Sequence, residues 1–184
     1  MSLADPQDEI ERLRAEVEAL RARAEAAEAL AERDVLTPAL NRRGFVREVN
    51  RAMAFARRHG TPATLLYLDM DGFKAINDSL GHAAGDAALV RVARLLIDEV
   101  RGGDAVGRMG GDEFAVLLLG ADLEQGRAKA AALEAALAGA PFEFEGKAAR
   151  LGASFGVRAL PEALDAEGWL AEADAAMWLR KNGR

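Results

Sequence analysis

The sequence contains no cysteine and only two histidines among its 184 residues. Disulfide bonds and thiolate metal sites are therefore excluded, and a zinc site would have too few ligands. Any bound metal has to be held by oxygen atoms, which favours magnesium or calcium. Long apolar runs are missing too: none approaches the roughly 20 residues that span a bilayer, and no signal-peptide core follows the first residues. We therefore expect a cytoplasmic chain without a membrane segment.

Basic charge is also scarce. The 24 Lys and Arg residues are outnumbered by 30 Asp and Glu, which gives a formal charge of -6. Without a broad basic surface, a nucleic-acid duplex is not an expected partner, and a phosphate-bearing ligand would need a bridging cation. Hydrophobic residues make up 51% of the chain, enough to bury a core. The length suits one domain of ordinary size with an appendage.

The appendage is predicted at the N-terminus. Residues 8–33 contain no Gly or Pro, and their apolar positions alternate by three and four like a coiled-coil seam: Ile10, Leu13, Val17, Leu20, Ala24, Ala27 and Ala31. β-Branched residues at one seam position and Leu at the other favour a parallel two-stranded coil. The alternative is a single amphipathic helix lying on its own domain. Because a helix of roughly 40 Å would project awkwardly from a monomer, we expect a homodimer.

Two domains follow from this interpretation. Residues 1–33 form an N-terminal signalling helix or coiled coil, and residues 34–184 form the globular domain. The opening Met1-Ser2-Leu3 is typical of a cloning leader, so we expect that a sensor domain stands upstream in the natural protein.

The globular part alternates between helix and strand patterns. Helices are predicted from about residue 45 to His59-Gly60 and over residues 85–100, 123–137 and 164–180. Strands are predicted at residues 63–68, 105–109, 113–119, 142–145 and 149–157, with a tight hairpin turn at Gly110-Gly111. The pattern predicts an α/β (α+β) fold in which helices pack on a mixed, mainly antiparallel sheet.

Acidic residues follow two of these strand patterns. Asp69 and Asp71 come after the first strand, and Asp112 and Glu113 come after the glycine turn. Clustered carboxylates at rigid positions suit a hard divalent cation and the triphosphate that it binds. Taken alone, acidic residues at strand ends are usually solvated turn formers.

The pentapeptide from Gly110 to Phe114 spells the GGDEF signature, which a chain would contain by chance about once in a million positions. Further similarity extends over about residues 34–184, in the blocks that begin at Asp34, Asn41, Asp69, Gly81, Gly85 and Ser154. The chain therefore resembles the GGDEF family of diguanylate cyclases. That resemblance implies a fold similar to the polymerase palm and the class III nucleotidyl cyclases. It also implies that two GTP molecules are condensed into cyclic di-GMP and two pyrophosphates.

The resemblance further implies a set of site residues. Mg²⁺ or Mn²⁺ is expected on Asp69, the backbone carbonyl of Met70, and Asp112. Glu113 and Asp112 are the expected catalytic residues, with either Glu113 or a metal-bound hydroxide removing the proton.

GTP is expected on five further residues. Asn77 and Asp86 would select guanine, the alternative being that they only cap helices. The backbone amides at Phe73 and Lys74 would meet the phosphates, and so would Lys181, whose alternative role is that of a cation at a helix C-terminus.

An inhibitory product site is expected at Arg101-Gly102-Gly103-Asp104, which matches the RxxD motif, together with Arg108. A glycine turn flanked by a salt-bridged Arg and Asp would look the same. Two departures from the family stand out: Pro38-Ala39 replaces Gly-Leu, and the tail is one residue shorter after Lys181, so Arg184 is not among the expected site residues. The competing functions are a catalytically inactive cyclic di-GMP receptor and a structural dimerisation module.

We expect a parallel dimer through residues 8–33, because only a second helix can cover the apolar seam over its whole length. Light scattering at micromolar concentration should give about twice the 19.6 kDa mass of the chain. The mass of a single chain would contradict the coil.

Overall fold

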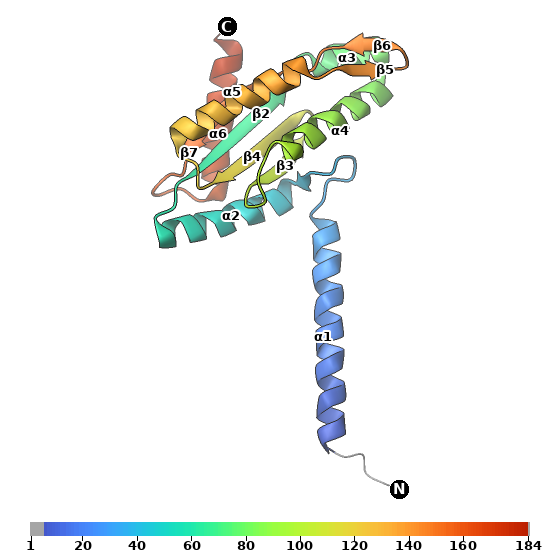
Figure 1. The fold of residues 1–184 in the computed structure, drawn as a ribbon, viewed down its shortest axis with the longest axis vertical. Coiled ribbons are helices and arrows are strands. Elements are labelled where there is room, and N and C mark those ends of the chain that lie inside the picture. Colours follow the sequence, from blue (N-terminus) through green and yellow to red (C-terminus); the bar gives the residue numbers. More distant parts are fainter. Residues whose placement is uncertain (1–5, 184) are drawn as a thin grey trace. The chain divides into compact units, whose positions relative to one another are not determined.

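The computed structural model of the protein describes residues 6–183, and it divides between residues 32 and 33 into two compact units. In the first unit, helix α1 covers Pro6–Ala31 (Figure 1). Four of its predicted seam residues are 45–55% exposed in the single chain: Ile10, Leu13, Val17 and Leu20. The side chains of Ala24 and Ala27 lie outside the described part, as do residues 1–3 and Arg184. In the described part, no helix has both the length and the apolarity to cross a membrane.

The second unit is built on one five-stranded sheet with the order β1-β3-β4-β2-β7. The first pair, β1 and β3, is parallel, and the other pairs are antiparallel. The sheet strands are β1 Leu40–Asn41, β3 Ala105–Gly110, β4 Glu113–Leu119, β2 Ala63–Met70 and β7 Ala153–Ala159. The predicted mixed, mainly antiparallel sheet is confirmed.

Helices cover both faces of this sheet. They are α2 Arg42–His59, α3 Phe73–Leu80, α4 His82–Asp98, α5 Leu123–Gly139 and α6 Ala166–Asn182. A separate hairpin, β5 Phe142–Phe144 with β6 Lys147–Ala149, follows α5 and projects at one end of the unit (orange in Figure 1).

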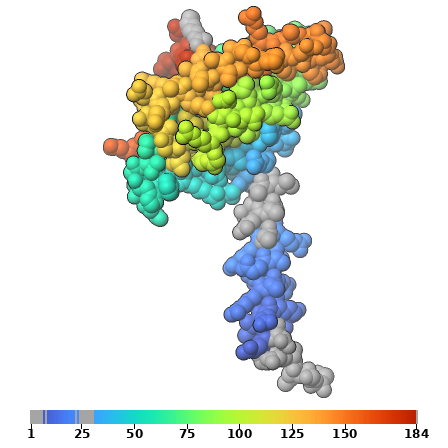
Figure 2. Space-filling view, viewed as in Figure 1, coloured from blue at the N-terminus to red at the C-terminus, as the bar shows by residue number. Residues whose placement is uncertain are grey.

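Two hydrophobic cores lie on opposite sides of the sheet, because side chains alternate along a strand. Leu66 and Leu68 of β2 join the core beneath α4 and α5, the two helices that cover the near face in Figure 2. Leu65 and Tyr67 join the other core, beneath α2 and α6, where Trp169 is fully buried. The odd-numbered residues of β2 therefore face α2 and α6, and Asp69 continues that series.

Three elements differ from the sequence prediction. Helix α3 was not predicted, because its eight residues make only about two turns and its apolar stripe of Phe73, Ile76 and Leu80 is too short to set it apart from a loop. Strand β1 has two residues, too few for a pattern. The single strand predicted over residues 149–157 was wrong: it is divided into β6 and β7 where the chain leaves the small hairpin to join the main sheet.

Helix α6 lies unusually close to β7, and Gly156 makes this possible. A Cβ atom at this position would stand 2.0 Å from the Ala173 carbonyl oxygen and 2.3 Å from the Met177 nitrogen. Backbone atoms cannot turn aside as a flexible side chain can. The missing side chain therefore fixes the distance between α6 and the sheet, and α6 carries Lys181.

We expect Gly156→Ala to lower the free energy of unfolding by about 3 kcal/mol or more, because α6 must be displaced from β7. Urea denaturation followed by circular dichroism measures the loss. Gly152→Ala is the matched control, since its Cβ would meet only the Asp71 side chain at 3.6 Å. Equal stabilities of the two variants would contradict the close approach of α6.

Candidate active site

The register between β2 and β4 gathers the predicted metal and catalytic residues at one end of the sheet. Asp69 is paired directly with Glu113 across the two strands. The Met70 amide donates to the Asp112 carbonyl oxygen at 3.2 Å, in the turn that precedes β4. The structure thus brings two pairs of neighbouring residues together: Asp69 with Met70, and Asp112 with Glu113. More than forty positions separate the two pairs in the sequence.

The glycine turn that joins β3 to β4 needs its glycines. Gly110 and Gly111 have φ angles of 156° and 49°, a region that side-chain-bearing residues rarely adopt. The pairing of β3 with β4 also shifts by one residue between Arg108 and Gly110. Arg108 then donates from Nε and Nη2 to the Gly111 carbonyl oxygen, at 3.0 and 2.7 Å. The turn that presents Asp112 is therefore held by its backbone as well as by Arg108.

Negative charge is concentrated at this end of the sheet and is only partly offset. Burial first, and then the charge of Asp69, raise the pKa of the Asp112 carboxyl. Lys181, at the end of α6, bonds through Nζ to Asp69 Oδ1. Burial alone would lower the pKa of the Lys181 ammonium, but the bond to Asp69 and the charges of Asp71 and Asp112 raise it. Lys181 thus stands as the cation beside Asp69.

These residues fit a hard divalent cation. The donors are two carboxylates and a backbone carbonyl, all oxygen, as Mg²⁺ prefers. Burial and then the charge of Asp69 raise the pKa of Asp112, and a cation between the two carboxylates would relieve their repulsion. Among the residues that the structure describes, no three acidic, His or Cys side chains form a group able to hold a metal. Side-chain ligation would therefore rest on Asp69 and Asp112.

Two contacts of the site were missed by sequence reasoning. The Tyr67 hydroxyl donates to Glu113 Oε2 at 2.9 Å, and the Ser154 hydroxyl donates to Asp71 Oδ1 at 2.9 Å. Burial, followed by the bond to Glu113, raises the pKa of Tyr67 above its ordinary value, so its hydroxyl stays protonated. The one signal in the sequence is that Tyr67 stands two residues before Asp69, on the same face of the strand.

The predicted guanine residues come from two adjacent helices. A Cβ atom at Gly85 would lie 2.0 Å from Asn77 Oδ1, so the Asn77 amide of α3 rests on α4 immediately before Asp86. The N-cap positions of these helices are Gly72 and Gly81, so neither Asn77 nor Asp86 is an N-cap. Asn77 is half-buried and Asp86 is exposed.

Phe73 and Lys74 are the first two residues of α3, where backbone amides have no acceptor within the helix. Such amides point outward from a helix N-terminus and suit an anion. The structure places both residues directly after the loop that follows β2.

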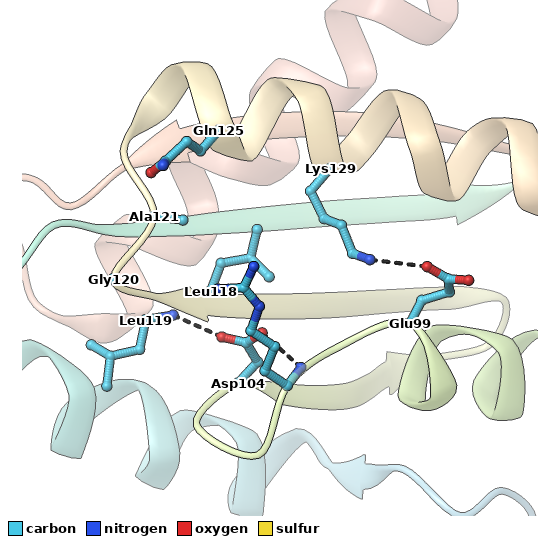
Figure 3. A pocket seen from close by; sticks show the side chains of 9 residues that line it. Glu99, Asp104, Leu118, Leu119, Gly120, Ala121, Gln125 and Lys129 are labelled. Atoms are coloured by element: carbon cyan, nitrogen blue, oxygen red, sulfur yellow. Dashed lines mark hydrogen bonds and ion pairs between the residues drawn. The ribbon is translucent and has the colours of Figure 1, made fainter.

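The expected inhibitory motif forms a tight turn before β3. The Asp104 amide donates to the Arg101 carbonyl oxygen at 2.9 Å, and the Asp104 carboxylate accepts from the amides of Arg101 and Leu119, at 3.0 Å each. The turn borders a pocket of about 200 Å³ between the end of α4 and the start of α5 (Figure 3). Lys129, paired with Glu99 at 3.0 Å, lies on its far side.

Arg108 is not brought together with Arg101 and Asp104. It lies within β3, four residues after Asp104, and points to the glycine turn, where its side chain is only 15% exposed. The expectation was that product bridges Arg101 of one domain to Arg108 or Arg42 of another, and this separation within one chain leaves that a prediction.

Comparison with known proteins agrees with this geometry. The family described as diguanylate cyclase, GGDEF domain, matches residues 31–184. The chain belongs to this GGDEF family. It is 36% identical over 154 residues, 83% of its length, to the probable diguanylate cyclase DgcE of Escherichia coli, of which it covers 14%. It is 38% identical over 155 residues, 82% of its length, to the diguanylate cyclase TpbB of Pseudomonas aeruginosa, of which it covers 35%.

A solved structure extends the likeness to the N-terminal helix. The coiled coil and GGDEF domain of DgcB from Caulobacter crescentus, in complex with c-di-GMP, matches with a TM-score of 0.82 and 27% identity. The match covers 96% of this chain and 94% of that one. The chain thus spans a small part of both curated relatives and nearly all of this crystallised fragment.

The Asp34 carboxylate connects the start of the GGDEF domain to the glycine turn of the signature. Asp34 accepts from the Thr37 amide and hydroxyl, at 2.8 Å each, and from Arg108 Nη1 at 3.2 Å. Burial alone would raise the pKa of Asp34, but the bonds from Thr37 and Arg108 outweigh it and hold this pKa below its ordinary value. Because Arg108 also holds Gly111, the loop at Thr37 and the glycine turn share one network.

We expect Asp34→Asn to destabilise the domain by about 2 kcal/mol at pH 7, since the charge-assisted bonds are lost. The folded-state pKa of Asp34 lies below its unfolded value of about 4, so its contribution is complete above that pH and fades as the pH falls through the folded pKa. Urea midpoints of both proteins at pH 7, 5, 4 and 3 measure this. A difference that stayed constant below pH 4 would contradict it, and Asp98→Asn is the exposed control.

Proposed function

We propose that this chain is a magnesium-dependent diguanylate cyclase that condenses two GTP molecules into cyclic di-GMP and two pyrophosphates. The observation that carries this proposal is the convergence of Asp69, Asp112 and Glu113 at one end of the sheet, with Lys181 beside them. Similarity to diguanylate cyclases over more than four fifths of the chain supports it.

Each GGDEF domain would bind one GTP through groups of three kinds. The Asn77 amide and the Asp86 carboxylate would pair with the guanine edge, Asp86 accepting from its N1–H and exocyclic amine. The amides at Phe73 and Lys74 would bind the β- and γ-phosphates at the start of α3. Lys181, now bonded to Asp69, would turn to the phosphates once another cation neutralises that carboxylate.

Asp69, Asp112 and the Met70 carbonyl would hold the Mg²⁺ or Mn²⁺ ion. When bound, that ion would neutralise the triphosphate and the leaving pyrophosphate. Glu113 would accept the proton of a 3′-hydroxyl as it attacks the α-phosphate of the other GTP. The Tyr67 hydroxyl donates to Glu113 Oε2, which leaves Oε1 available to the substrate and keeps the carboxylate oriented.

One domain would bind only one of the two GTP molecules, so the reaction requires a second copy of the domain. A two-stranded coil of α1 would bring two domains to a high effective concentration. The half-exposed seam of α1 supports that pairing. Product binding at the Arg101 turn would add feedback at a distance from the metal residues, since Asp104 directly precedes β3 and Gly110 is its last residue.

Asp112→Ala tests the activity. We expect product formation to fall by at least about 100-fold, because a metal ligand is lost, while unfolding changes by less than about 0.5 kcal/mol at this turn. The protein is incubated with GTP and Mg²⁺, and the product is identified by chromatography and mass spectrometry. Asp98→Ala, an exposed carboxylate at the end of α4, is the matched control. Retained turnover in Asp112→Ala would remove Asp112 from the site.

Arg101→Ala tests the feedback. Losing a bidentate arginine contact to guanine costs about 1 to 3 kcal/mol, so the variant should need roughly tenfold or more cyclic di-GMP for equal inhibition. The initial rate without product should not change. Initial velocity against added cyclic di-GMP measures both, and inhibition should be non-competitive with GTP. Coincident curves for the two proteins would show that residues 101–104 serve only as a turn.

A further inference from the structure

One acidic residue beside the candidate active site has no part in the proposed reaction. Asp71 lies two positions after Asp69 and directly before Gly72, the N-cap residue of α3. The Ser154 hydroxyl donates to Asp71 Oδ1 at 2.9 Å, and the Asp71 amide donates to the Gly152 carbonyl oxygen, also at 2.9 Å. Both the side chain and the backbone of Asp71 are therefore held by the start of β7 rather than by the helix that follows.

The Ser154 hydroxyl that makes this contact lies inside the protein. Ser154 is only 2% exposed, and it is paired with Asp69 in the register between β2 and β7. A hydroxyl that is removed from water needs a hydrogen-bond partner, and the Asp71 carboxylate is that partner. The bond therefore satisfies a buried group at the edge of the site.

The first amides of α3 have no side-chain acceptor. Gly72 has no side chain with which to cap the helix, and no other side chain accepts from the amides of Phe73 or Lys74 in the described part of the chain. An aspartate readily accepts from the amide two residues further on, which for Asp71 is the Phe73 amide. The bond from Ser154 thus competes with a local turn that would close the start of α3.

We propose that Ser154 is a positioning residue that holds the Asp71 carboxylate on β7 and so keeps the first amides of α3 open to the phosphates of GTP. This proposal rests on the proposed function, in which the amides at Phe73 and Lys74 bind the β- and γ-phosphates. Ser154 itself touches no nucleotide and acts only through Asp71. Without the hydroxyl, the carboxylate turns to the Phe73 amide.

A carboxylate in that position would oppose the nucleotide in two ways. It would occupy a donor that the phosphates use, and it would place a negative charge beside a triphosphate of the same sign. The guanine end is held elsewhere, because Asn77 lies beyond the first turn of α3 and Asp86 lies in α4. The loss of affinity should therefore fall on nucleotides that carry β- and γ-phosphates.

The binding of two nucleotides tests this. GMP carries guanine without the β- and γ-phosphates, whereas a non-hydrolysable GTP analogue carries both. We expect Ser154→Ala to weaken binding of the analogue with Mg²⁺ by about tenfold in isothermal titration calorimetry, and to leave the affinity for GMP unchanged. Ser79→Ala is the matched control, because the Ser79 hydroxyl belongs to α3 and donates to the Ala75 carbonyl oxygen. That control should leave both affinities as they are.

A double-mutant cycle then separates a competing carboxylate from a simple anchor of the loop. We expect Asp71→Ala to bind the analogue at least as tightly as the wild type, and Ser154→Ala to have no further effect in that background. If the hydroxyl only anchored the loop, Asp71→Ala would weaken the analogue as much as Ser154→Ala does. That result would overturn the proposal.

Three further outcomes would also count against it. An equal loss of affinity for GMP and for the analogue in Ser154→Ala would show a general disturbance of the fold. Unchanged affinity for the analogue, in a protein whose wild type makes cyclic di-GMP, would remove the role of Ser154 and leave the cyclase assignment intact. A wild-type protein that binds neither nucleotide would contradict the proposed function and this proposal with it.

Discussion

The register between β2 and β4 is the constraint on which the candidate site depends. It pairs Asp69 with Glu113 and leaves Asp112 in the turn at the same end. A slip of one residue would turn every side chain of β2 to the opposite face and would send Asp69 into the core beneath α4 and α5. Burying an unpaired carboxylate there would cost several kcal/mol, so the two cores enforce the register that assembles the carboxylates. The register between β2 and β4 therefore both stabilises the fold and assembles the candidate site.

The sequence predicted those features that depend on neighbours in the chain. Short apolar runs marked the strands, Gly110-Gly111 marked the hairpin, and the GGDEF signature marked which acidic residues belong together. The sheet order and the contacts of distant residues could not be predicted. Asp34 lies 74 positions from Arg108, and Tyr67 lies 46 positions from Glu113. No local pattern connects such pairs, because only the packed sheet brings them within reach of a hydrogen bond.

Arg108 has contacts within its own chain that its place in the motif did not predict. By its place before the signature it was expected in the product site that joins two domains, and within its own chain its guanidinium is shared between Asp34 and the Gly111 carbonyl. A planar group with several donors in fixed directions can satisfy a carboxylate and a carbonyl at once. In this domain that capacity links the entry loop to the signature turn, which a lysine with its compact charge could not reproduce.

The close packing of α6 on β7 also affects how this domain folds during its synthesis on the ribosome. Residues 166–182 emerge last among the described elements, yet they supply Trp169 to one core and Lys181 to a partner 112 positions earlier. Until they emerge, one face of the sheet has only α2 to cover it, and Asp69 lacks its ammonium neighbour. A nascent chain halted before α6 would therefore expose the apolar side chains of β2 and β4 to chaperones and proteases. Completion of the fold and completion of the site therefore depend on the same helix.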